Sequence, residues 1–391
     1  MAPEATTDDR RWLEGARKLA RRGWGHVHPN PLVGCVLVRE GESVAEGWHR
    51  EFGGPHAEVE ALRRAGEKAR GATAYVSLEP CAHHGKTPPC ADALAEAGVE
   101  RVVYGGADPT VEAGGGAARL REAGVEVVGP VLSREEARRD NPTFFLRAEG
   151  AGPWTALKLA MSLDGGIAAR PGCRTALTGP EAAEDAHRLR AGFDAILVGS
   201  RTVEVDDPRL TVRDAPSPRV PPVRVVADSG ARMRPDAALL SGDGPPVWIA
   251  VSPEAPRERT GALEEAGARV LRIAAAEGGI DLGELLDRLR EEGIRAVLCE
   301  GGGVLASALL REGRVHRVYL YVAPRLLGED AVPAFSGPFR EEPLDGWTLL
   351  ESRTLGRDGR LVWDAPEPGT DGPEPTYEGR GSRDRHPPEA T

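Results

Sequence analysis

The stretch L-E-P-C-A-H-H-G-K-T-P-P-C occupies residues 78–90, and H-A-E stands upstream at residues 56–58. Together they offer one imidazole and two thiols, from His56, Cys81 and Cys90. Zinc binds nitrogen and sulfur donors of this kind in tetrahedral geometry, and a catalytic zinc keeps one of its four positions for water. Three ligands therefore predict a zinc site with an open position.

Glu58 follows His56 by two residues, close enough to serve the same site without being a ligand. Zinc lowers the pKa of its bound water from about 16 to about 7, so hydroxide exists at neutral pH. We expect Glu58 to take the proton of that water and to deliver it to a ring nitrogen and to departing ammonia. This combination hydrolyses amino groups off heteroaromatic rings in one class of enzyme.

Two other interpretations of the cysteines stay open. A structural zinc site usually closes with a fourth Cys or His, and His83 or His84 could supply that ligand. The thiols could also carry no metal. Both alternatives leave Glu58 without a chemical role.

Composition limits the class of protein. A length of 391 residues suffices for two domains with full cores. The formal net charge of −11 disfavours nucleic-acid binding, because phosphate binding relies on Lys and Arg. We expect no membrane span, since no run of 18 apolar residues occurs, and no secretory signal in the polar N-terminus. Five cysteines without a disulfide pattern fit a reducing cytoplasm.

The first part of the chain alternates helix and strand patterns. Apolar periodicity predicts helices at 8–22 (capped by Asp8 or Asp9), 56–65 and 88–97, and strands at 33–38, 43–49, 73–78, 101–104 and 125–128. These elements predict an α/β domain with helices on both faces of a mixed sheet. His56 and Glu58 fall in the first turn of one helix. The small and breaker residues at 148–153 predict a linker, so we expect the first domain at 1–149.

A second α/β domain is expected at 150–364. Strands are predicted at 154–160, 195–198, 223–227, 247–251, 269–273, 296–299 and 315–322, and helices at 180–190, 257–266, 282–291 and 304–311. Residues 365–391 hold six prolines and four glycines with almost no apolar side chains, which predicts a disordered tail.

A glycine-rich turn, C-E-G-G-G at 299–303, follows an apolar strand and opens a helix. Glycines there let backbone N–H groups approach a phosphate at a helix N-terminus. The spacing is not that of the Rossmann fingerprint, and a flexible turn is the alternative.

Four motifs resemble the bifunctional riboflavin-biosynthesis deaminase-reductase family. They are H-P-N-P-L-V-G-C-V at 28–36, G-W-H at 47–49, H-A-E-V-E-A-L at 56–62 and the stretch at 78–90. Other deaminases separate the two cysteines by two residues, whereas eight separate them here. The resemblance covers roughly residues 10–365. It implies a cytidine-deaminase-like α/β/α domain followed by a dihydrofolate-reductase-like α/β domain.

For the first domain, the resemblance implies that Asn30, His49, His83 and Lys86 contact a pyrimidinone and its ribose phosphate. Lys86 offers a point charge to phosphate, and Asn30 carries both a donor and an acceptor for a ring edge. Taken without the resemblance, Asn30 fits a turn before Pro31 and His49 a strand histidine. The chain departs from the family's D-P-N-P at D-P-T-V, residues 108–111.

For the second domain, the resemblance rests on K-L-A-M-S-L-D-G at 158–165 and T-V-E-V-D-D-P-R-L-T-V-R at 202–213. It implies NADPH as cofactor. The implied cofactor contacts are Ala160, Thr202, Asp206, Ser229, Gly302, Gly303, Val304, Leu305, Ala306, Ser307 and Ala308. The implied substrate contacts are Arg190, Leu210, Arg213 and Glu300, and we add Arg174 as a charge near phosphate. Arg174 and Ala176 stand where family members commonly carry Ser and a Trp that packs on the cofactor.

The resemblance predicts two consecutive reactions in one cytoplasmic enzyme, without nucleic-acid or membrane partners and as a homo-oligomer, dimer or tetramer. Zinc-dependent deamination of 2,5-diamino-6-(5-phosphoribosylamino)pyrimidin-4(3H)-one precedes NADPH-dependent reduction of the ribosyl group to ribityl. No residue is assigned as proton donor of the reduction. The rival predictions are a deaminase whose C-terminal domain only binds or oligomerises, and a nucleic-acid deaminase or zinc-binding module.

Overall fold

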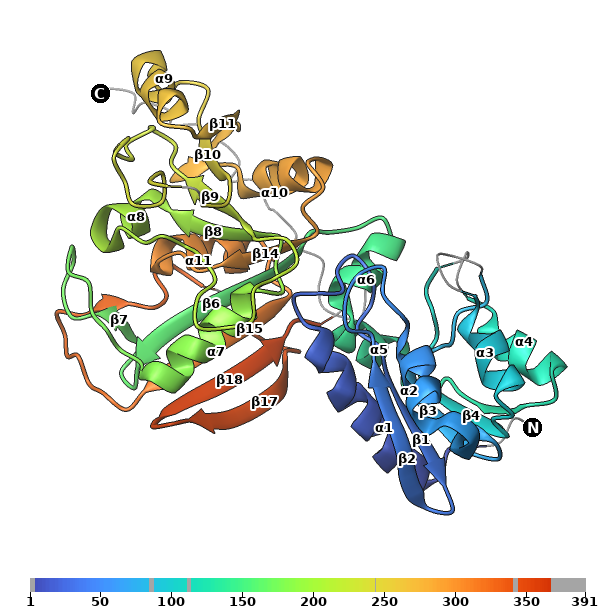
Figure 1. The fold of residues 1–391 in the computed structure, drawn as a ribbon. Coiled ribbons are helices and arrows are strands. Elements are labelled where there is room, and N and C mark those ends of the chain that lie inside the picture. The colour runs from blue at the N-terminus through green and yellow to red at the C-terminus, as the bar shows by residue number, and fades with distance from the viewer. Residues whose placement is uncertain (1–3, 84–87, 111–113, 243, 340–343, 367–391) are drawn as a thin grey trace, which may run out of the picture.

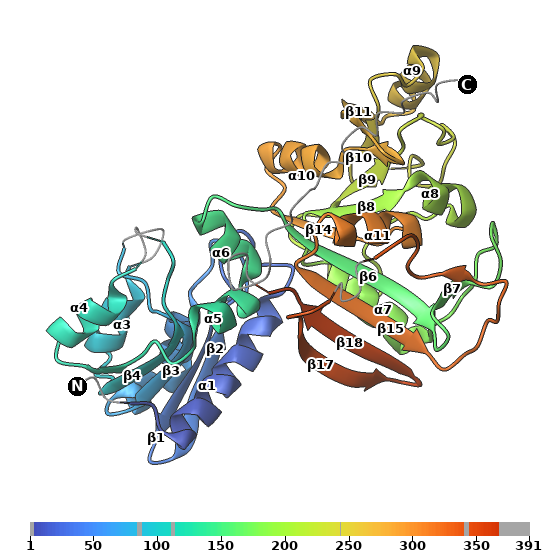
Figure 2. The same ribbon diagram turned by 180° about the vertical axis from the view of Figure 1, so that it is seen from behind.

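The computed structural model describes residues 4–83, 88–110, 114–242, 244–339 and 344–366. Figures 1 and 2 show two lobes, the first coloured blue to cyan and the second green to red. Among the described residues, no helix has both the length and the apolar character needed to span a membrane.

The first lobe is built on a mixed five-stranded sheet. Its strands are β1 (Gly34–Arg39), β2 (Glu42–Trp48), β3 (Thr73–Leu78), β4 (Arg101–Gly106) and β5 (Glu126–Val128). Their order is β2-β1-β3-β4-β5. The strand β1 pairs antiparallel with β2 and β3, whereas β3, β4 and β5 run parallel.

Helices cover both faces of this sheet, as the sequence predicts. They are α1 (Thr7–Ala20), η1 (Arg21–Gly23), α2 (Ala57–Ala65), η2 (Gly66–Ala69), α3 (Cys90–Glu96), α4 (Gly116–Glu122), α5 (Arg134–Asp140) and α6 (Pro142–Ala148). Alternate residues of β1 serve the two faces: Val36 packs in the core under α1, whereas Leu37 packs in the core under α2 and α3. The period of two along the strand explains why one apolar run supplies both cores.

At the starts of α1 and α2, a residue takes a position other than the predicted one. Thr6, not Asp8 or Asp9, is the N-cap of α1. Its hydroxyl accepts from the Asp9 N–H, and the Asp9 carboxylate accepts from the Thr6 N–H, which together form a capping box. The Asp9 carboxylate is buried against Arg101, which holds its pKa well below the usual range. His56 is the N-cap of α2 and lies outside the helix, so Glu58 alone is in the first turn.

The second lobe is built on a nine-stranded sheet. Its strands are β6 (Trp154–Ser162), β8 (Ala195–Gly199), β9 (Val223–Ala227), β10 (Val247–Val251), β11 (Arg269–Arg272), β14 (Ala296–Cys299), β15 (Arg317–Ala323), β17 (Thr348–Leu355) and β18 (Asp358–Asp364). Two small pairs join β7 (Gly166–Ala168) to β16 (Val332–Pro333) and β12 (Ala275–Ala276) to β13 (Gly279–Ile280). The helices are α7 (Pro180–Arg190), α8 (Ser200–Asp206), α9 (Arg257–Glu265), α10 (Leu282–Glu291) and α11 (Gly303–Arg311).

The strand order β11-β10-β9-β8-β14-β6-β15-β18-β17 contains a topological switch point. From β8 the chain continues to β9 on one side, whereas from β14 it continues to β15 on the other. Both strands run parallel, so their carboxyl ends meet at one edge. Ligands of open α/β sheets bind in the crevice at such a point. The β17–β18 hairpin, antiparallel to β15, was not predicted from the sequence.

Gly47 on β2 allows α2 to approach the sheet closely. A Cβ atom at this position would lie 2.3 Å from the Ala57 carbonyl oxygen and 2.5 Å from the Ala61 nitrogen. Real Cβ atoms do not approach backbone atoms this closely, so any side chain here displaces α2. The start of α2 carries His56 and Glu58.

We therefore expect Gly47→Ala to lower the free energy of unfolding by about 1–3 kcal/mol and to reduce the zinc bound per chain. Metal analysis and thermal unfolding of the purified variant measure both effects. Gly15→Ala is the matched control, because its Cβ would meet only Val36 Cγ2 at 3.9 Å. Full zinc content together with wild-type unfolding in Gly47→Ala would contradict this account.

Candidate active sites

Three sequence-predicted residues converge in the first lobe. The donor atoms of His56, Cys81 and Cys90 all lie within 4.8 Å of one another. His56 Nδ1 is 3.2 Å from Cys90 Sγ and 3.6 Å from Cys81 Sγ. Tetrahedral zinc with bonds of about 2.1 Å to nitrogen and 2.3 Å to sulfur separates such ligands by roughly 3.6 Å. The donor set and its spacing thus fit zinc.

The local fold explains the convergence. Cys81 follows the carboxyl end of β3, and Cys90 is the first residue of α3, whose backbone N–H points at Cys81 Sγ at 3.4 Å. The contact with Cys90 lowers the pKa of the Cys81 thiol to about 4 and raises that of Cys90. Metal ligation by such thiols requires their deprotonation, so a bound divalent cation would release protons from the pair.

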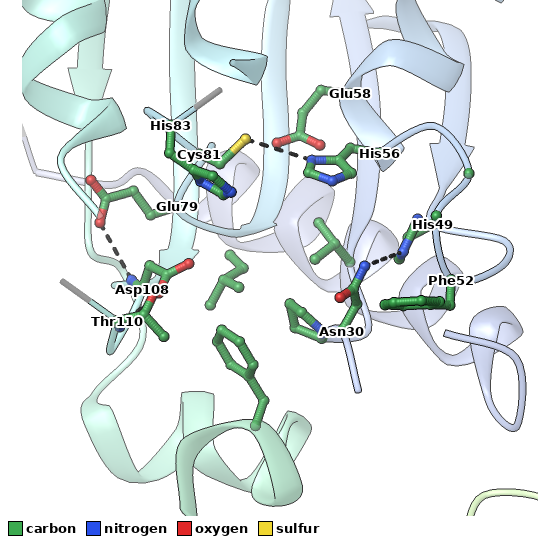
Figure 3. A pocket seen from close by; sticks show the side chains of 16 residues that line it. Asn30, His49, Phe52, His56, Glu58, Glu79, Cys81, His83, Asp108 and Thr110 are labelled. Atoms are coloured by element: carbon green, nitrogen blue, oxygen red, sulfur yellow. Dashed lines mark hydrogen bonds between the residues drawn. The ribbon is translucent and has the colours of Figure 1, made fainter. Parts of the chain in front are cut away.

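Glu58 lies beside this cluster and is 3% exposed. Burial raises the pKa of its carboxyl group to about 7, against the opposing charge of His56. Figure 3 shows Glu58, in the first turn of α2, and His56, the cap before this helix, pointing toward Cys81. A carboxyl group whose pKa lies near neutrality can accept and release a proton at the cluster.

A cavity of about 290 Å³ opens on the cluster. Six of the residues that line it were predicted for this site: Asn30, His49, His56, Glu58, Cys81 and His83. The other lining residues were not assigned to the site from the sequence: Pro31, Val33, Phe52, Gly53, Gly54, Leu78, Glu79, Asp108, Thr110 and Phe144. The volume is that of a small-molecule site. Among the described residues, His83 lines the cavity but does not join the three-donor cluster. Lys86 and His84 lie outside the described residues.

Asn30 and His49 form one wall of this cavity (Figure 3). His49 Nδ1 is 3.0 Å from the Pro55 carbonyl oxygen, which can only accept, so Nδ1 carries the proton. His49 Nε2 then accepts from Asn30 Nδ2 at 3.1 Å. Burial lowers the pKa of His49, which favours this neutral form. The bond to His49 leaves Asn30 Oδ1 as an acceptor for a bound ring.

On the opposite wall, backbone N–H groups donate hydrogen bonds to the side chain of Glu79. The Glu79 carboxylate accepts from the N–H groups of Asp108, Gly115 and Ala117. Asp108 Oδ1 in turn accepts from the Thr110 N–H and hydroxyl. At the departure from the family's D-P-N-P pattern, Asp108 and Thr110 thus line the same cavity as His56 and Cys81.

In the second lobe, the residues predicted to contact a cofactor lie around the switch point. Thr202 is on α8, directly after β8, and its Oγ1 accepts from the Gly302 N–H at 3.2 Å. Gly303 begins α11 after β14. Two carboxyl ends of parallel strands and a helix N-terminus therefore lie at one edge of the sheet, an arrangement that suits the phosphates of a dinucleotide. Ala160 lies on β6, beside β14.

The other residues predicted to contact the cofactor differ in how exposed their side chains are. Val304 is exposed, whereas Ala306 and Ser307 are fully buried, and the Ser307 hydroxyl accepts from the Ser336 N–H. Ser229 follows β9, one strand beyond β8. Burial raises the pKa of Asp206, and the charge of Arg174 opposes this shift, which places Arg174 near α8. The remaining predicted positions, Leu305 and Ala308, are half-buried on α11.

Arg190 and Glu300 form a two-bond ion pair at 2.5 and 2.9 Å. Arg190 ends α7, and Glu300 directly follows β14. Lys158 Nζ, from β6, lies 3.8 Å from Glu300 and 5.4 Å from the centre of the Tyr321 ring. Burial alone would raise the pKa of Glu300, but the two cations lower it to about 2. Lys158 belongs to the motif at 158–165 but was not predicted as a site residue, and the structure shows its contact with Glu300.

The segment with Leu210 and Arg213 borders this ion pair. Arg190 Nη1 donates to the Thr211 carbonyl oxygen, and the Arg213 N–H points at His187 Nδ1. The Leu210 side chain is buried in the core, whereas Arg213 is exposed. Arg213 therefore extends toward solvent beside the Arg190–Glu300 pair.

Comparison with known proteins identifies both halves. Residues 6–106 match the cytidine and deoxycytidylate deaminase zinc-binding region, and residues 153–360 match the RibD C-terminal domain. These matches confirm the predicted fold class, a cytidine-deaminase-like domain followed by a dihydrofolate-reductase-like domain. They support zinc and NADPH as the cofactors, and they disfavour a monofunctional deaminase.

Relatives cover nearly the whole chain. The riboflavin biosynthesis protein RibD of Escherichia coli is 43% identical over 364 residues, which span 90% of this chain and 97% of that protein. Acinetobacter baumannii RibD has a TM-score of 0.73 at 37% identity, covering 92% of this chain and 99% of that chain. A Thermotoga maritima diaminohydroxyphosphoribosylaminopyrimidine deaminase/5-amino-6-(5-phosphoribosylamino)uracil reductase has a TM-score of 0.74 at 31% identity, with the same coverage. The chain therefore belongs to the RibD family of riboflavin biosynthesis proteins.

Proposed function

We propose that this chain catalyses two successive steps of riboflavin biosynthesis. The first removes the 2-amino group of 2,5-diamino-6-(5-phosphoribosylamino)pyrimidin-4(3H)-one by hydrolysis. The second reduces the ribosyl group of the product to ribityl with NADPH. The observation that carries the first assignment is the three-donor cluster with the buried Glu58 beside it, at the floor of a cavity of about 290 Å³.

For the deamination, we assign His56, Cys81 and Cys90 as zinc ligands. Zinc, when bound, supplies a Lewis acid that makes hydroxide available at neutral pH. Glu58 accepts the proton of the attacking water and returns it to the ring nitrogen and to the leaving ammonia. Asn30 Oδ1 accepts from a ring N–H or amino group, because His49 occupies its amide nitrogen. We keep His83 and Lys86 as the remaining substrate contacts, Lys86 by phosphate pairing.

For the reduction, we assign the crevice at the carboxyl ends of β8 and β14 to NADPH, which supplies hydride when bound. Thr202, Asp206, Ser229, Ala160 and the stretch Gly302–Ala308 border it. Arg190, Arg213 and Arg174 suit phosphate through paired donors, and Glu300 accepts from ribose hydroxyls. The backbone around Leu210 completes the substrate side. Lys158 adds a buried ammonium next to Glu300, and burial lowers its pKa.

The wider setting is part of the same proposal. We divide the chain into a deaminase domain at 1–149 and a reductase domain at 150–364; the two separate sheets support this division. The predicted disordered tail, 365–391, lies almost entirely outside the described residues. A cytoplasmic homo-oligomer, dimer or tetramer, is the form that we propose.

Glu58→Gln separates the two activities. The amide keeps the size of the side chain but cannot accept the proton, so ammonia release should fall by at least about a hundredfold, on the scale of general acid–base catalysis. Zinc content and NADPH oxidation with deaminated substrate should stay at wild-type levels, and removal of zinc by a chelator should likewise spare the reduction. Unchanged ammonia release from the zinc-loaded variant would refute the role of Glu58.

Asn30→Asp tests how the ring is read. The carboxylate has no hydrogen to donate to His49 Nε2, so the wall loses its internal bond and gains a negative charge. We expect KM for the deamination to rise about tenfold to a hundredfold, as when one buried polar partner is lost. Zinc content and the KM of the reduction serve as internal controls. A wild-type KM would show that Asn30 does not contact the substrate.

Glu300→Gln tests the second site. It keeps the shape of the side chain and removes the charge that Arg190 and Lys158 share. We expect the KM for the ribosyl substrate to rise roughly tenfold or more, in line with loss of a charge-assisted pair. The KM for NADPH and the deamination should change little. Equal losses of NADPH and substrate binding would indicate a damaged fold rather than a substrate contact.

A further inference from the structure

The segment Trp24–Leu32, which we term the bridge segment, belongs by sequence to the first domain but lies against the second. It begins at Trp24 and carries Asn30 to the deaminase cavity. A small cavity of about 50 Å³ lies along it, lined on the second-domain side by Gly192, and shares Asn30 and Phe144 with the larger cavity. The bridge segment therefore contacts both halves of the protein.

Trp24 is inserted into an aromatic cluster of the second domain. Its ring meets Trp154 and Phe193 edge to face, at 6.5 and 6.0 Å between centroids, and those two rings stack on each other at 5.0 Å. A Cβ on Gly192 would lie 1.9 Å from the indole, so only glycine fits there. Such packing leaves the indole one position.

The indole also holds the end of α7. Trp24 Nε1 donates to the carbonyl oxygens of Arg188 and Leu189, at 3.1 and 3.3 Å. These carbonyls belong to the last turn of the helix, and the Leu189 carbonyl also accepts from the Gly192 N–H at 3.2 Å. The residue after Leu189 is Arg190, which pairs with Glu300 in the reductase site. Trp24 thus binds the backbone of Leu189, the residue directly before a proposed substrate contact.

The second domain holds the rest of the bridge segment through Arg219 and Asp194. The Arg219 N–H donates to the Gly25 carbonyl oxygen, and its Nη2 donates to that of His28 at 2.8 Å. The same guanidinium lies 4.9 Å from the centre of the Phe52 ring, which lines the deaminase cavity. His28 Nε2 is 3.4 Å from Asp194 Oδ2. The position of Asn30 therefore depends on contacts from the other domain.

We propose that Trp24 is a positioning residue for both active sites. Through the end of α7 it holds Arg190, and through the bridge segment it holds Asn30 against His49. This inference rests on the proposed function of the two sites. It adds that neither substrate site is complete within its own domain, and that one side chain outside both sites sets the substrate affinity of each.

The test uses three variants of the full-length enzyme. Trp24→Ala removes the whole contact and should raise KM for both reactions by roughly tenfold to a hundredfold, the scale on which a displacement of about 1 Å acts. Trp24→Phe keeps a ring but loses the bonds to α7, so the KM of the reduction should rise more than that of the deamination. Arg219→Ala leaves α7 untouched and should raise only the KM of the deamination.

Two matched controls distinguish positioning from general destabilisation. Trp12, on α1 beside Tyr75, and Trp248, on β10 beside Arg269, are half-buried tryptophans to which neither proposed site assigns a role. Trp12→Ala and Trp248→Ala should lower the unfolding temperature and leave both KM values unchanged. In every variant, zinc content and kcat report whether the catalytic groups are intact.

The outcomes are decisive. If Trp24→Ala folds, retains zinc and shows wild-type KM for both reactions, the proposal is wrong. It is also wrong if the two control variants raise KM as much. Should Trp24→Ala fail to fold, the surface variant Arg219→Ala and the mild variant Trp24→Phe still decide it by their opposite selectivity. Failure of the proposed function itself would appear in Glu58→Gln and Glu300→Gln instead.

Discussion

The close packing of α2 onto β1 and β2 is the constraint on which the first active site depends. Gly47 lets the helix approach the sheet, and that approach sets where His56 and Glu58 stand. The other donors come from two further segments on the same face of the sheet, after β3 and at the start of α3. A site built from three separate segments is therefore only as accurate as the packing between them, which explains why its first-domain core is rich in small residues such as Ala57, Ala61 and Ala91.

Much of this arrangement could be predicted from the sequence, for identifiable reasons. The parallel strands of the second domain are buried on both faces, so their apolar runs stand out; β9, β10 and β14 have the predicted bounds. The hairpin of β17 and β18 was missed because β17 is an edge strand with mostly exposed, partly charged residues and no clear alternation. The cap of α1 was misassigned because Asp9, which is buried, performs a second task and pairs with the half-buried Arg101.

The residues of the candidate sites likewise fall into those that the sequence predicts and those that only the structure shows. The proposed zinc donors and Glu58 are recognisable because rare residue types stand at fixed spacing. Phe52 and Phe144 could not be recognised, since nothing in an isolated aromatic residue distinguishes a cavity wall from a core. Trp24 contacts residues more than 160 positions away in the chain, and Lys158 reaches Glu300 only through sheet order. Contacts of this range follow from topology, which local sequence pattern does not encode.

The ion cluster of the reductase site has a consequence for how an acidic protein handles an acidic metabolite. Three cations, Lys158, Arg190 and Arg213, face two carboxylates, Glu300 and Asp214, in this region, although the chain as a whole carries −11. At physiological ionic strength charges are screened beyond about 8 Å, so an approaching phosphate responds to the nearby cations more than to the distant carboxylates. Reduction of the sugar leaves the phosphate in place. The same local field thus favours both capture of the substrate and retention of the product, so added salt slows capture and speeds release.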